Sequence, residues 1–128
     1  MNEITMNVDW IAVIAGTVVS FLLGWLWYSP ALFGKKWAEG VGVELGAAAS
    51  MPVMAMVTQL AATFLLAWVV GIAAKQNALT TAILIAVTIA LFVVSGGLFA
   101  KKSSYAIAVE AGFVIVMVAV MILAQAVL

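Results

Sequence analysis

One carboxylate lies inside a long apolar stretch of this chain, and it is the first candidate for chemistry. Glu110 stands five residues after Tyr105, where the last apolar run begins. Charge inside a membrane span costs about 2.5 to 3.5 kcal/mol on insertion scales, so such a residue needs a partner or a purpose. A carboxyl group there could bind a proton or a cation, as in a small transporter or channel. Gln59, Ser20 and Ser95 are expected at comparable depths in the other runs and complete the candidate polar site.

A structural role is the competing interpretation of Glu110. Its side chain could reach water or the nearby Lys101 and Lys102. Alternatively, it could stay protonated and form a hydrogen bond with Gln59. Transport paths usually contain several paired ionisable groups, so a single carboxylate favours the structural interpretation.

The composition excludes several kinds of site. The sequence contains no histidine or cysteine, and all five of its cationic residues are lysines. His general bases, thiol nucleophiles and Cys or His metal sites are therefore impossible. We predict that the protein is not an enzyme and holds no metal or cofactor. The net charge of zero provides no electrostatic basis for a nucleic-acid partner.

Most side chains must face lipid rather than water. The chain is 68% hydrophobic and 8% charged, whereas a soluble domain is about 25% charged. A hydrocarbon core about 30 Å thick needs about 20 apolar residues in a helix. We predict a single domain, residues 1–128, that folds as an all-α membrane protein with a bundle of four transmembrane helices. The spans cover about 10–28, 52–74, 79–100 and 105–128.

The lysines predict the orientation of these spans. Lys35 and Lys36 lie in the first connection, and Lys101 and Lys102 lie in the third. The second connection contains only Lys75, and neither terminus contains a lysine. Because short cytoplasmic loops are rich in lysine, we expect the first and third connections in the cytoplasm and both termini outside it.

Aromatic and basic residues gather at the end of the first span, and residues 31–39 after it are predicted to form a short interfacial helix. Trp and Tyr rings favour the headgroup zone, and lysines there face anionic headgroups. A specific binding site is the alternative to a simple anchor. The predicted anchor consists of Trp25, Trp27, Tyr28, Phe33, Lys35, Lys36 and Trp37.

Four small residues follow one another at four-residue spacing in the first span. Ala12, Gly16, Ser20 and Gly24 form this small-residue stripe. Membrane helices approach closely along such faces. The stripe could contact another helix of the same chain or a second copy, and we expect a homo-oligomer because so small a unit has lipid-facing surface to spare.

The end of the first span also resembles a known family. The family's opening pattern is N-W, a hydrophobic run and G-x-x-W-Y-S-P-x-x-F-G-x-x-W. It is matched by Asn7 and Trp10, which are one residue further apart than usual, and by Gly24, Trp27, Tyr28, Ser29, Pro30, Phe33, Gly34 and Trp37. Through these residues the chain resembles DUF1761, a family of small bacterial membrane proteins of unknown function. The resemblance implies four spans and localisation to the inner membrane of a prokaryote.

A second, shorter part of the family pattern lies in the last span. The segment Glu110-Ala-Gly-Phe113 stands where the family usually has N-A-G-Y. Glu110 replaces the asparagine and Phe113 the tyrosine, so a role of that asparagine does not carry over.

These observations favour a structural or accessory membrane protein that self-associates or docks a membrane protein partner in the lipid bilayer. The alternative is an oligomeric small transporter or channel with Glu110 as its proton or cation site.

Overall fold

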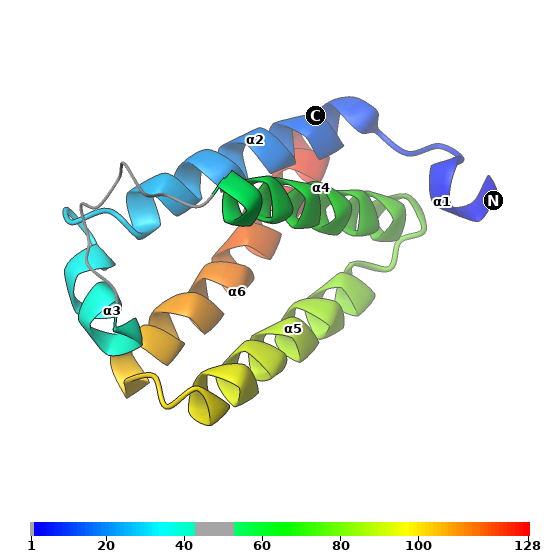
Figure 1. Ribbon diagram of the computed structural model, residues 1–128. Coiled ribbons are helices and arrows are strands. Elements are labelled where there is room, and N and C mark those ends of the chain that lie inside the picture. The colour runs from blue at the N-terminus through cyan, green and yellow to red at the C-terminus, as the bar shows by residue number, and fades with distance from the viewer. Residues whose placement is uncertain (1, 43–52) are drawn as a thin grey trace.

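The structure, a computed structural model, describes residues 2–42 and 53–128, and every regular element in these residues is a helix (Figure 1). Pro52, the first residue of the predicted second span, lies outside the described residues. The helices are α1 (Asn2–Thr5), α2 (Trp10–Trp27), α3 (Gly34–Val41), α4 (Val53–Lys75), α5 (Leu79–Phe99) and α6 (Ser104–Val127).

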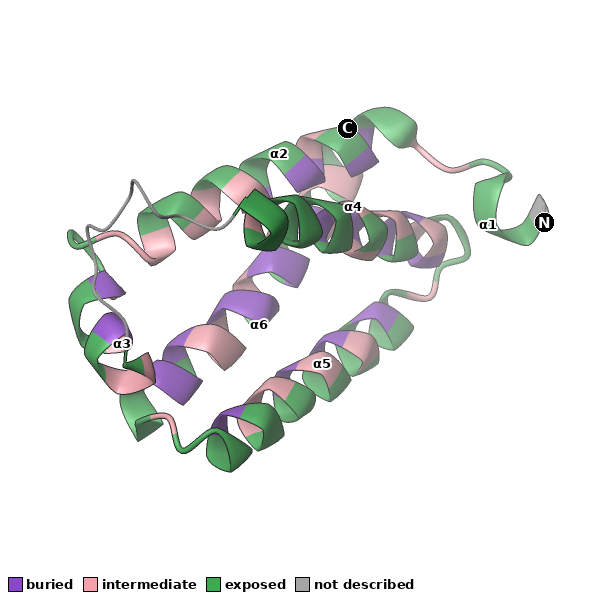
Figure 2. Ribbon diagram, viewed as in Figure 1, coloured by how far each residue is buried: buried purple, intermediate pink, exposed green. Residues whose placement is uncertain are grey.

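The four long helices are long and apolar enough to cross a membrane. They contain 18 to 24 residues with mean hydropathies of 1.9 to 2.7, and at 1.5 Å per residue this length matches the hydrocarbon core. Many large apolar residues are exposed, and Figure 2 shows exposed residues along much of α4 and α5. The predicted all-α fold with four span-length helices and a short helix after the first is confirmed.

Polar caps fix where two of the long helices begin. The carboxylate of Asp9 accepts a hydrogen bond from the backbone N–H of Ala12 at 3.1 Å, at the start of α2. The hydroxyl of Ser103 accepts one from the N–H of Ala106 at 3.0 Å, at the start of α6. Each cap satisfies a backbone donor that has no partner within its helix.

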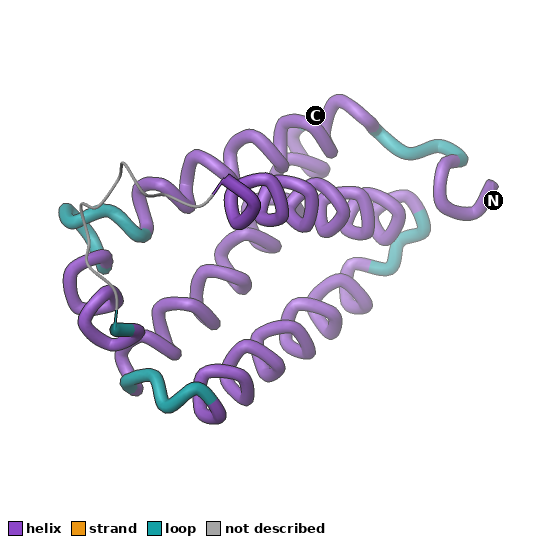
Figure 3. The backbone as a smooth tube through the Cα atoms, viewed as in Figure 1, coloured by secondary structure: helices purple, strands orange, loops and turns teal. Residues whose placement is uncertain are grey.

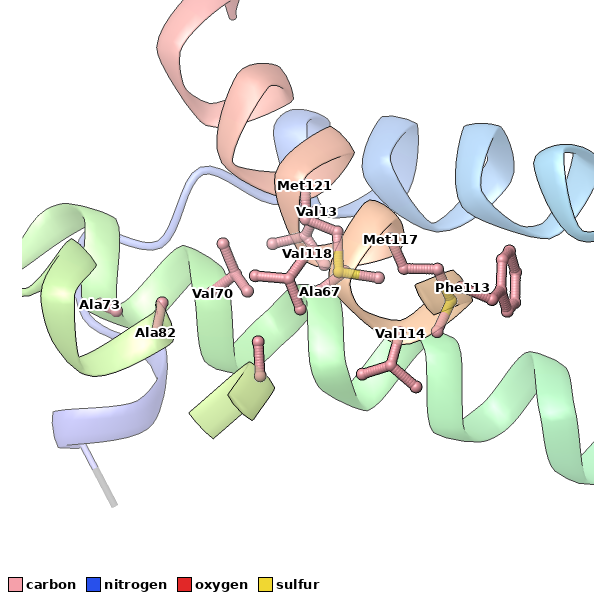
Figure 4. Packing of buried hydrophobic residues seen from close by; sticks show 11 residues of the cluster. Val13, Ala67, Val70, Ala73, Ala82, Phe113, Val114, Met117, Val118 and Met121 are labelled. Carbon is pink, nitrogen blue, oxygen red and sulfur yellow. The ribbon is translucent and has the colours of Figure 1, made fainter. Parts of the chain in front are cut away.

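Helix α6 is the centre of the bundle. It packs against α2, α3, α4 and α5, and Figure 2 shows buried residues along much of its length. Phe113, Met117 and Met121 of α6 meet Val13 of α2 and Val70 of α4 in the hydrophobic core (Figure 4). The position of α6 therefore determines which residues can meet at each end of the bundle.

The small-residue stripe of α2 packs against another helix of the same chain. A methyl group on Gly16 would lie 3.4 Å from a side-chain carbon of Met121, and one on Gly24 would lie 3.0 Å from the ring of Phe113. Both neighbours belong to α6. The stripe thus brings α2 close to α6 within one chain, which answers the question that the sequence leaves open.

Two connections that are far apart in sequence lie at the same end of the bundle. Figure 3 shows the α2–α3 and α5–α6 connections on the same side of the bundle, with the short helix after α2 between them. The backbone N–H of Ser103 in the α5–α6 connection donates a hydrogen bond to the carbonyl of Gly40, near the end of α3, at 3.0 Å. The four lysines of the first and third connections are therefore at one end.

Candidate functional site

A tight turn folds α3 back from the end of α2. Its predicted segment, 31–39, is shifted relative to the observed helix, which begins at Gly34, because residues before it are held in turns. The N–H of Gly34 donates to the carbonyl of Ser29 at 2.9 Å. A methyl group at Gly34 would clash with the carbonyl oxygen of Tyr28. A glycine is thus needed at this point of the turn.

Helix α3 packs closely on the start of α6. The carbonyl of Gly40 accepts the Ser103 hydrogen bond, and a methyl group on Gly40 would clash with the Ser103 hydroxyl and lie 2.7 Å from the Cβ of Ala106. Gly34 and Ala38 lie four residues apart, on one face of α3, and both are buried. This face therefore packs against protein.

Glu110 of α6 has two partners, Trp37 on α3 and Lys102 in the α5–α6 connection. The indole Nε1 of Trp37 donates a hydrogen bond to Oε2 of Glu110 at 2.9 Å. The Nζ of Lys102 lies 3.0 Å from both carboxylate oxygens and forms an ion pair. The side chain of Glu110 is 17% exposed and that of Lys102 is 30% exposed. We call these three residues the Glu110 triad.

An aromatic cluster continues from the triad towards the core. The ring of Tyr28 lies 4.9 Å from that of Trp37 and 5.5 Å from that of Phe113, both edge-on. The ring of Trp27 lies 4.8 Å from that of Phe33, and its Nε1 donates to the carbonyl of Val109 at 3.0 Å. Such edge-on aromatic pairs contribute about 0.5 to 1.5 kcal/mol beyond their buried area.

The triad satisfies a charge that would otherwise be costly. A carboxylate in a largely buried position is stable when a cation and hydrogen-bond donors surround it, and removing one partner leaves the charge unpaired. The ion pair with Lys102 is one of the alternatives that the sequence leaves open. The hydrogen bond between Trp37 and Glu110 links α3 to α6 and so to the bundle.

The structure does not bring the four predicted polar residues together. Gln59 of α4 and Ser95 of α5 are exposed. Ser20 is fully buried, and within the described residues its hydroxyl has no hydrogen-bond partner. Of the four, Glu110 alone is placed among charged and aromatic partners.

The remaining predicted anchor residues point outward at the same end. Trp25 is 63% exposed, and Lys35 and Lys36 are exposed on α3. The amine of Lys36 lies 5.4 Å from the centre of the Tyr105 ring. Their role as a membrane anchor stays a prediction.

Sequence reasoning did not find the Trp37–Glu110 contact or the role of Gly40. The signal available was the presence of Trp37 and Glu110 in the two segments that resemble the family pattern. A further contact at the opposite end was also missed: Trp68 Nε1 donates to the carbonyl of Ile4 at 2.6 Å.

Within the described residues, no group of three or more acidic residues could hold a metal ion.

Comparison with known proteins gives the family of the chain. No curated protein and no solved structure matches the chain. The profile of a family described as "Protein of unknown function (DUF1761)" matches residues 11–125, which include both segments that meet in the aromatic cluster. The chain belongs to the DUF1761 family.

Proposed function

We propose that this protein is a non-catalytic accessory membrane protein that acts through contacts in the bilayer, with a second copy of itself or with another membrane protein. The observation that carries the proposal is the engagement of Glu110, the only charged residue within the four span-length helices apart from the terminal Lys75. Its contacts with two partners, Trp37 and Lys102, support a structural role.

The transporter alternative has less support. A carrier site must take up and release its proton or cation, whereas the charge of Glu110 is already matched by Lys102. Glu110 lies six residues into α6, which places it roughly 9 Å from the helix start and close to the headgroup end. Gln59 and Ser95, the other polar residues expected for such a path, are exposed, and within the described residues neither forms a hydrogen bond with Glu110.

Self-association would use the outer face of α5. The small-residue stripe of α2 is occupied by α6, so it is not available to a second copy. On α5 a hollow of about 420 Å³ is lined by Leu91, Val94, Ser95, Leu98 and Phe99. Membrane helices associate through close packing, and this hollow has room for a large side chain from a neighbouring helix.

The proposed location is the inner membrane of a prokaryote, with the α3 end in the cytoplasm and both termini outside. The number of lysines at each end of the bundle supports this orientation, because short cytoplasmic loops are rich in lysine. Four of them lie in the α2–α3 and α5–α6 connections, including α3 itself, and the fifth is Lys75 at the opposite end. Compartment reporters fused to each terminus would test it, and a cytoplasmic C-terminus would contradict it.

Proteoliposomes test the choice between the two functions. Under an imposed pH gradient, the accessory role predicts the same proton leak for protein-free liposomes, the wild type and Glu110→Gln. A flux that the wild type supports and Glu110→Gln loses would establish the transporter alternative instead.

Copy number tests the self-association. Photobleaching steps of labelled protein in a large excess of lipid should reveal more than one copy for the wild type and one copy for Ser95→Trp, which fills the hollow. Ile83→Trp, on another side of α5, is the matched control and should behave as the wild type. A wild type that is monomeric throughout would overturn this part of the proposal.

A further inference from the structure

A second hollow lies beside α3, at the lysine-rich end of the bundle. It has a volume of about 200 Å³ and is lined by Trp27, Phe33, Tyr105, Ala108 and Val109. The lining is almost entirely apolar and includes three aromatic rings. Its residues come from the end of α2, the following turn and the first two turns of α6, which Figure 1 shows at the end where α3 lies.

The hollow is open to the outside of the bundle. Tyr105 is 39% exposed and Ala108 is also exposed. In a membrane, lipid molecules would be its immediate neighbours. The volume is below the 300 to 1,000 Å³ of typical small-molecule pockets, so the hollow suits one segment of an acyl chain rather than a complete ligand.

A cation stands next to this apolar hollow. The Nζ of Lys36 lies 5.4 Å from the centre of the Tyr105 ring, one of the lining rings. Lys36 is exposed on α3, and the ion pair of the Glu110 triad is formed by a different lysine, Lys102. Within residues 2–42 and 53–128 no carboxylate forms an ion pair with Lys36, so its charge is available to an anion.

Apolar and cationic groups in this arrangement complement a phospholipid. Trp and Tyr rings favour the headgroup zone, and lysine is attracted to anionic lipid there. We propose that this end of the protein binds an anionic phospholipid, with the part of one acyl chain next to the headgroup in the hollow and the phosphate at Lys36.

This inference depends on the membrane location in the proposed function, and not on the accessory role. If the flux or copy-number tests fail, the lipid site is unaffected. If the lipid site fails, those two tests keep their meaning.

Native mass spectrometry of the detergent-solubilised protein provides the test. Dioleoylphosphatidylglycerol and dioleoylphosphatidylcholine are titrated separately, and the fraction of protein with one bound lipid is measured. The wild type should bind the anionic lipid more tightly than the zwitterionic one. Lys36→Gln should weaken binding of the anionic lipid by about fivefold, the effect of one lysine near an anionic surface, and Lys36→Arg should restore it.

Two further variants separate the hollow from general charge. Lys35→Gln removes the neighbouring charge, which points about 100° away around the helix, and it should retain tight binding. Ala108→Phe fills the hollow from an exposed position and should weaken binding of both lipids, with an unchanged circular dichroism spectrum. Equal losses in Lys35→Gln and Lys36→Gln, or normal binding by Ala108→Phe, would overturn the proposal.

Discussion

The indole of Trp37 donates a hydrogen bond to the carboxylate of Glu110 at 2.9 Å, across a separation of 73 residues in the sequence. This contact links the short helix α3 to the central helix α6. It also joins the two segments through which the chain resembles its family. The most specific part of the sequence therefore builds one structural unit, composed of the turn after α2, helix α3 and the first half of α6.

Removing the Trp37 donor should weaken this unit. Trp37→Phe keeps an aromatic ring beside Tyr28 but cannot donate to Glu110, so the largely buried carboxylate loses one partner. Hydrogen bonds to charged groups contribute about 1.5 to 3 kcal/mol, and we expect a loss of stability at the lower end of that range. Unfolding by sodium dodecyl sulfate in mixed micelles would measure it. The effect should disappear when Trp37→Phe is introduced into Glu110→Leu, which has no acceptor, and full additivity of the two changes would contradict the contact.

Lys102 and Lys101 offer a matched pair of substitutions. Lys102→Gln removes the ion pair with Glu110, whereas Lys101 is exposed. Since Lys102 is 30% exposed, solvent screens the pair, and we expect Lys102→Gln to cost about 1 to 2 kcal/mol rather than the full value of a buried pair. Lys101→Gln should change stability by less than about 0.5 kcal/mol. The same detergent titration measures both changes in stability. Equal effects of the two substitutions would show that the ion pair does not contribute to stability.

The spans were predictable, because their length and hydropathy are properties of the sequence alone. The depth of Glu110 in the last span was predictable for the same reason. The direction in which a polar side chain points around its helix was not predictable: Gln59 and Ser95 have suitable depths but are exposed and do not contact Glu110.

The partners of Glu110 illustrate the same limit. The sequence places Lys102 eight residues before Glu110, so this pair was a natural alternative. The contact with Trp37 requires α3 to fold back onto α6, which depends on the turn at Gly34 and the close approach at Gly40. Neither follows from hydropathy. The apolar face of α3 could equally have entered lipid, and only packing against α6 decides between the two.

Gly34 and Gly40 allow α3 to pack against α6, and Gly96 provides a control position. A methyl group on Gly40 would clash with the Ser103 hydroxyl, whereas one on Gly96 would meet nothing within 4 Å. Gly40→Ala should separate α3 from α6, with a loss of about 1 to 3 kcal/mol from overpacking. Gly96→Ala should be neutral or slightly stabilising, because alanine favours a helix over glycine.

Accessibility of Trp37 reports this separation directly. Acrylamide should quench tryptophan fluorescence more strongly in Gly40→Ala than in the wild type, and Trp37→Phe should remove most of that difference. If quenching is the same in Gly40→Ala and Gly96→Ala, α3 does not depend on the close approach at Gly40.

The last prediction concerns Gly16 in the small-residue stripe. A methyl group there would already lie 3.4 Å from a side-chain carbon of Met121, so Gly16→Leu must push α2 away from α6. Because the stripe packs within one chain, this substitution should lower the stability of each monomer by about 1 to 3 kcal/mol. Val18→Leu, at an exposed position of the same helix, should leave stability unchanged. Detergent titration measures the stability, and photobleaching measures the copy number. A Gly16→Leu protein of normal stability with a reduced copy number would mean that the stripe contacts a second copy rather than α6.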